Sequence, residues 1–164
     1  MTHFSTNGMG QFCLCCVLLA ALVGCGGADN DTKLAEVNST NIQRLANLYF
    51  TFQLTNDFQG PTDEAAFKDF IRGFDSQKLA RVGVDPNAID ALFTSERDDE
   101  PFKVRYGVTG SAMGSSEPVI FEALGVDGKR QVGFLNMTQR EVDQAEYDLL
   151  WAGEAHPASA PREY

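Results

Sequence analysis

Apolar positions in the first half of the chain recur at steps of three and four residues, which places them on one face of a helix. They predict a helix over residues 41–55, ended by the Gly60-Pro61 pair. A second helix is expected from Thr62, its predicted N-cap, to about Gly73. Aromatic side chains are dense across both helices and indicate a helix–helix core: Tyr49, Phe50, Phe52, Phe58, Phe67, Phe70 and Phe74.

Two shorter helical segments are expected next. Residues 76–82 form one of them. Asp85 and Pro86 begin the other, because an aspartate cap followed by proline suits the first helical turn. Ile89 and Leu92 are predicted to point into the core.

The pattern then changes to alternation of apolar and polar residues, which is typical of half-buried strands. Residues 102–108 form one predicted strand. Residues 118–124 and 129–136 form a predicted hairpin around Asp127-Gly128, a pair that tolerates the positive φ angles of a two-residue turn.

This turn sets the register of the hairpin, with Val126 opposite Lys129 and Phe121 opposite Phe134. Five apolar side chains then share a core face: Val119, Phe121, Ala123, Val132 and Phe134. The opposite face carries three more, which is more than a solvated face requires: Ile120, Leu124 and Leu135. Either a helix of this chain covers that second face, or it is a possible partner face.

Residues 138–141 read Thr-Gln-Arg-Glu, a capping box that predicts a helix from this point to about Trp151. The order of elements predicts an α+β fold, with N-terminal helices packed on a small antiparallel β-meander and followed by a C-terminal helix. Residues 38–152 form the single domain, and the polar, Pro-rich residues 153–164 form a disordered tail.

The start of the chain has a different character. Residues 12–23 are twelve consecutive apolar residues, which is too short for a membrane-spanning helix of about 20 residues but suits the core of a signal peptide. Leu22-Val23-Gly24-Cys25 follows at its end. This segment resembles the signal peptide and lipobox of bacterial lipoproteins.

The resemblance implies that Leu22, Val23 and Gly24 are recognised by the signal peptidase and that Cys25 becomes the lipidated first residue. Residues 1–24 would be the signal peptide, and residues 25–37 the lipidated cysteine and a tether. Two or three acyl chains such as palmitate anchor a protein stably. The expected location is the bacterial cell envelope, facing the periplasm, and Gly26 after the cysteine favours the outer membrane.

The net charge and the cysteine and histidine content argue against several classes of function. The net charge of −10 lies entirely in residues 25–164, which excludes nucleic acid as a partner. After removal of residues 1–24 only Cys25 remains, so neither a disulfide within the chain nor a cysteine-based zinc site is possible. His156, in the tail, is the single histidine of the mature chain, which argues against a Ser–His or Cys–His nucleophile.

Residues 96–100 form the densest acidic cluster of the chain. Asp98, Asp99 and Glu100 are weak candidates for calcium ligands, but their spacing matches no standard calcium loop. We therefore predict no metal site and no cofactor.

The favoured hypothesis is a non-catalytic binding or structural domain that is held at a membrane by its lipid anchor and meets another envelope protein. One alternative is a carboxylate-dependent hydrolase that uses acids near residues 96–100. A second alternative is based on a helix that ends in Asn56-Asp57-Phe58-x-Gly60-Pro61 and precedes an antiparallel sheet. Over residues 41–136 this order resembles the periplasmic half of type II secretion pseudopilins and implies a subunit of a secretion assembly.

Overall fold

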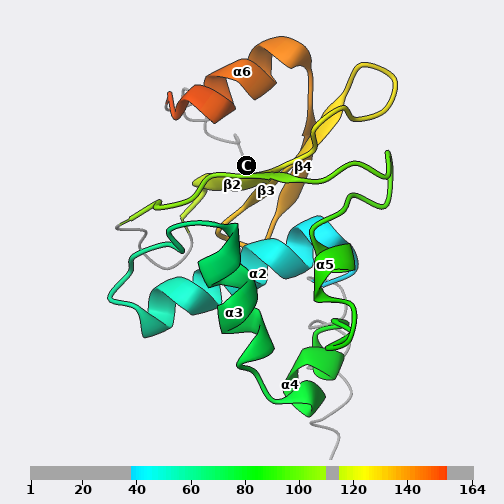
Figure 1. Ribbon diagram of the computed structural model, residues 1–164. Coiled ribbons are helices and arrows are strands. Elements are labelled where there is room, and N and C mark those ends of the chain that lie inside the picture. The colour runs from blue at the N-terminus through cyan, green and yellow to red at the C-terminus, as the bar shows by residue number, and fades with distance from the viewer. Residues whose placement is uncertain (1–37, 110–114, 155–164) are drawn as a thin grey trace, which may run out of the picture.

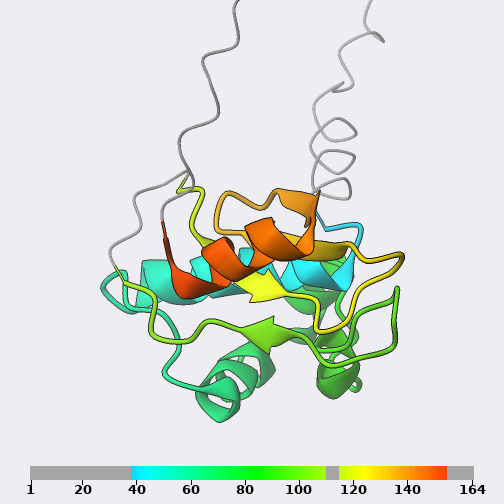
Figure 2. The same ribbon diagram turned by 90° about the horizontal axis from the view of Figure 1, so that it is seen from above.

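Helices cover both faces of a four-stranded antiparallel sheet in the computed structural model, which describes residues 38–109 and 115–154. Helices α2 to α5 lie on one side of the sheet and α6 on the other (Figure 1), and the view from above places α6 over the strands (Figure 2). The helices are α2 (Asn41–Thr55), α3 (Glu64–Arg72), α4 (Ser76–Arg81), α5 (Ile89–Leu92) and α6 (Gln144–Ala152). The strands are β1 (Lys103–Val104), β2 (Pro118–Phe121), β3 (Arg130–Phe134) and β4 (Gln139–Val142).

This architecture confirms the predicted α+β fold, in which helices precede a meander and a further helix follows it. The predictions for the signal peptide, Cys25, the tether and most of the tail concern residues 1–37 and 155–164, which lie outside the described residues. Across the described residues, no helix combines the length and the apolar character needed to cross a membrane.

Helix α2 is the central element and has the predicted bounds. Thr40 caps it by accepting a hydrogen bond from the backbone N–H of Gln43. The buried Tyr49 ties the helix to the segment after β1, because its hydroxyl donates to the carbonyl of Arg105 at 2.9 Å and accepts from the N–H of Val108 at 3.1 Å. Burial raises the pKa of Tyr49 to about 12, so the hydroxyl keeps its proton.

Helix α2 approaches β3 closely at Gly133. A β-carbon at this position would lie 2.9 Å from Cγ1 of Ile42 and 3.2 Å from the carbonyl oxygen of Ile42, closer than real side chains pack. Glycine in a strand often marks such an approach of another backbone. The missing side chain at Gly133 therefore sets the distance between the helical layer and the sheet.

Helices α3, α4 and α6 begin at aspartates, whereas α5 begins after Ala88 without a side-chain cap. Asp63, and not the predicted Thr62, caps α3 by accepting from the N–H of Ala66 at 2.8 Å. The prediction of a helix that begins at Asp85 is wrong, because the Asp85 side chain accepts from the N–H of Asn87 and closes a turn before α5. In both places a carboxylate captures the nearest free N–H groups.

Aromatic rings join α2 to α3 and α5 in a chain of edge-to-face contacts, as the sequence predicts. The Phe67 ring lies 5.7 Å from the Tyr49 ring and 5.6 Å from the Phe93 ring, and the Phe52 and Phe70 rings are 4.8 Å apart. This is the preferred geometry of aromatic pairs. The cluster is a packed core, as expected for helix–helix packing, but the prediction is wrong for Phe58, which is 47% exposed.

The predicted strand over residues 102–108 is wrong beyond its first part, because β1 ends at Val104. Gly107 has a φ of 69° and turns the chain toward the helices, where its N–H donates to the carbonyl of Pro61. The carbonyl of Val108 then accepts hydrogen bonds from Gly60 and from the side chain of Gln53. Hydrogen-bond donors from the helical layer thus bind this segment in place of a neighbouring strand.

The predicted capping box at residues 138–141 is also wrong. Residues 139–141 belong to β4, whose backbone pairs with β3, and α6 begins later with Asp143 as its cap. Asp143 accepts from the N–H of Glu146 at 2.9 Å, so an aspartate with a glutamate three residues later marks the true start. The Thr138 hydroxyl instead donates to Asn136 at 2.6 Å.

The sheet divides two cores. The larger one lies between the sheet and α2 to α5, and it contains Val119, Ile120 and Leu135. The smaller one lies under α6 and consists of six side chains: Phe121, Val132, Phe134, Val142, Tyr147 and Leu150. Val119 was expected on the face of Phe121, but the pairing of β2 shifts between Pro118 and Ile120 and puts it in the larger core.

The close approach at Gly133 generates a test. Gly133→Ala is expected to lower the free energy of unfolding by about 1–3 kcal/mol, because the new methyl group forces Ile42 and α2 away from the sheet. Urea denaturation followed by circular dichroism measures the change.

Gly73→Ala is the matched control, because Gly73 has a helical φ of −72° and no contact closer than 3.2 Å at the β-carbon position. It is expected to change the stability by less than about 1 kcal/mol. An equally small effect of Gly133→Ala would show that the layers are not in tight contact there.

Candidate functional site

The two arms of the β2–β3 hairpin differ in length. Asp127 and Gly128 form the predicted turn with φ angles of 52° and 76° and leave Val126 opposite Lys129. Phe121, however, pairs with Val132 rather than with the predicted Phe134, which pairs with Pro118. Four residues therefore stand on one arm, residues 122–125, where the other arm has two. We call residues 122–125 the hairpin bulge.

The carboxylate of Glu122 closes the hairpin bulge from inside. Glu122 is only 1% exposed, and one of its oxygens accepts from the N–H of Gln131 at 2.6 Å, as a strand carbonyl would. The other oxygen accepts from the Ser95 hydroxyl at 3.0 Å. The backbone carbonyl of Glu122 accepts from the Tyr147 hydroxyl on α6 at 2.9 Å. Both oxygens of the buried carboxylate thus accept hydrogen bonds, which offsets the cost of removing the charge from water.

Arg97, in the segment before β1, pairs its positive charge with Glu122. Arg97 places one guanidinium nitrogen 3.5 Å from the Glu122 carboxylate and another 3.0 Å from Glu141 on β4. Lys129 lies 3.7 Å from the same Glu141. This network connects the acidic segment at residues 95–100, which we call the acidic loop, to both the hairpin bulge and the last strand.

Asp98 of the acidic loop caps the backbone of the hairpin bulge. One of its oxygens accepts from the N–H groups of Gly125 at 2.6 Å and of Leu124 at 3.3 Å. Desolvation raises the pKa of Asp98, but hydrogen bonds from Gly125, Ser95, Glu100 and Leu124 outweigh it and hold the pKa below its usual value. The carboxylate is therefore ionised in neutral solution and binds the hairpin bulge.

Arg130 holds the hairpin bulge from the opposite side. Its Nε donates to the carbonyl of Leu124 at 3.0 Å, while its guanidinium lies 4.5 Å from the centre of the Tyr147 ring and bonds to Gln144. Both peptide groups of Leu124 are thus fixed by charged side chains. The Leu124 side chain nevertheless remains 61% exposed.

The structure separates the three residues of the predicted partner face. Ile120 is 0% and Leu135 is 1% exposed, because α2 and its neighbouring helices cover that face of the sheet. The prediction of a free partner face is therefore wrong for these two residues. Only Leu124 reaches the surface, since the hairpin bulge moves it out of the strand ladder.

The predicted metal candidates do not converge. The Asp98 carboxylate binds backbone N–H groups, and Asp99 lies on the surface in the left-handed region with a φ of 56°. Glu100 meets Asp98 through its backbone N–H rather than through its carboxylate. Within residues 38–109 and 115–154, no three histidine, cysteine or acidic side chains gather in a way that could hold a metal ion. Cys25, Leu22, Val23 and Gly24 lie outside the described residues.

Sequence reasoning did not find Ser95, Arg97 or Glu122 as members of one cluster. The available signal was Glu122 itself, a charged residue within the otherwise apolar run Pro118-Val-Ile-Phe-Glu-Ala-Leu. A buried carboxylate in such a run needs donors from elsewhere, and the acidic loop supplies them.

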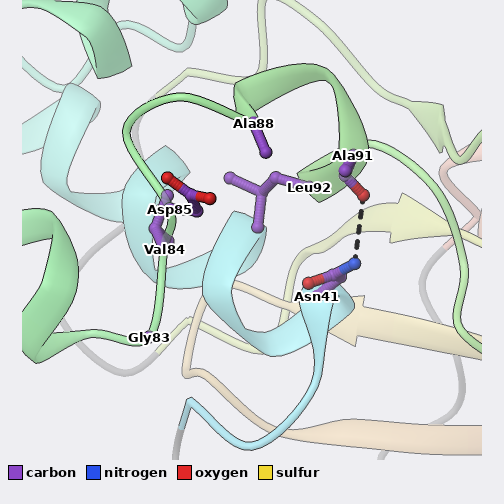
Figure 3. Close-up of a pocket in the computed structure, with 7 residues that line it drawn as sticks. All are labelled: Asn41, Gly83, Val84, Asp85, Ala88, Ala91 and Leu92. Carbon is purple, nitrogen blue, oxygen red and sulfur yellow. Dashed lines mark hydrogen bonds between the residues drawn. The ribbon is translucent and has the colours of Figure 1, made fainter.

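A small pocket lies beside the start of α2 (Figure 3) and has a volume of about 150 Å³. Its walls are mostly apolar: Asn41, Gly83, Val84, Asp85, Ala88, Ala91 and Leu92. Its two polar side chains are engaged within the protein, Asn41 with the carbonyls of Ala91 and Thr94 and Asp85 with the N–H of Asn87. Both polar side chains of the pocket therefore already serve the local fold.

Comparison with known proteins found no family model that matches the chain, no similar protein among those of curated function and no similar solved structure. At the junction of the acidic loop and the hairpin bulge, buried and half-buried charges hold the backbone in place.

The Glu122 carboxylate gives the first test of this junction. Glu122→Gln is expected to lower the free energy of unfolding by about 3 kcal/mol, because it leaves the half-buried guanidinium of Arg97 without its buried partner. Glu141→Gln removes the exposed partner of the same arginine and is expected to change stability by less than about 1 kcal/mol. Similar losses in the two variants, measured by urea denaturation, would contradict this account.

Because hydrogen bonds in the fold lower the pKa of Asp98, we expect the stability of the protein to depend on pH. Because the folded pKa of Asp98 lies below the usual value of 3.8, the ionised form stabilises the fold above that value, and this contribution is lost as the pH falls through the folded pKa. Asp98→Asn is therefore expected to be less stable than the parent by about 1 kcal/mol at neutral pH. The gap narrows as the pH is lowered from about 5 to about 2.

Asp99→Asn serves as the control for this experiment, since Asp99 is exposed beside Asp98. Asp99→Asn keeps the hydrogen bonds from Gly125 and Leu124 to Asp98, so its stability at neutral pH is expected to lie within about 0.5 kcal/mol of the parent. A gap for Asp98→Asn that is independent of pH would show that the carboxylate charge does not hold the hairpin bulge.

Proposed function

We propose that this chain is a bacterial envelope lipoprotein, anchored through lipidated Cys25, whose α+β domain binds or supports another envelope component without catalysis. The observation that carries the proposal is Leu22-Val23-Gly24-Cys25 directly after twelve apolar residues. A thiol is the most nucleophilic side chain available for alkylation, and a small residue before it suits a cleavage site.

The polar chemistry of the described residues supports a binding role. Glu122 and Asp98, the carboxylates at the junction, both accept hydrogen bonds from fixed backbone N–H groups. Catalytic acids and bases instead face a substrate in a cleft, with a pKa matched to proton transfer. In the pocket described above, the one carboxylate, Asp85, accepts hydrogen bonds from the backbone and side chain of Asn87.

The alternative, a secretion-assembly subunit, predicts a different fate for the first residues of the chain. A pseudopilin-like subunit needs its apolar N-terminal segment to remain attached as part of the assembly. A lipoprotein loses residues 1–24 and gains acyl chains on Cys25. The mass of the mature protein therefore separates the two proposals.

Intact mass spectrometry of the protein extracted from membranes tests the anchor. The expected mass is that of residues 25–164 plus diacylglycerol, and Cys25→Ala is expected to abolish both the added mass and the cleavage. Cys16→Ala is the matched control, because Cys16 lies in the segment that is removed, so the mature mass is unchanged. An unmodified, uncut chain of residues 1–164 would refute the proposal and favour the pseudopilin-like alternative.

A further inference from the structure

We draw no further inference here: the strongest candidate, the surface patch at the end of α2 where Leu54 and Phe58 are exposed, carries no proposal because nothing in the part of the chain that the structure describes shows what covers it.

Discussion

The distance between α2 and β3 is the constraint on which the other contacts of this structure depend. Gly133 allows Ile42 to lie against the strand backbone, and this approach brings Tyr49 within hydrogen-bonding distance of the segment after β1. The same approach buries Ile120 and leaves the opposite face of the sheet for α6. One absent side chain in a central strand thus determines how two layers of helices fit on a short sheet.

The buried carboxylate of Glu122 is the second feature that organises the structure. Glu122 lies between the two cores and accepts hydrogen bonds from β3 and from the acidic loop, while its own carbonyl accepts from α6. A buried ion pair contributes little stability compared with well-packed apolar residues, but removal of one partner is costly. Here the pair joins Arg97 to the buried Glu122, two residues before the exposed Leu124.

The sequence predicted the elements that local chemistry controls. The bounds of α2 followed from periodicity, and the hairpin turn followed from Asp127-Gly128. The register failed because it assumed equal arms, and nothing local reveals that a glutamate side chain replaces a ladder carbonyl. The start of α6 failed because two capping patterns, at Thr138 and Asp143, stand five residues apart and only pairing with β3 decides between them. The candidate site was missed for the same reason, since its members come from distant segments.

The meander has a consequence for how the chain reaches this structure. Its strands pair with their neighbours in sequence, and contacts of this kind form quickly. Helix α2 does not share this advantage, because Ile42 meets Gly133 and so waits for a strand roughly 90 residues later. Until β3 has been synthesised, Ile42 on α2 has no β3 backbone to pack against. A chain emerging from a ribosome therefore exposes this part of α2 before the strand that covers it exists.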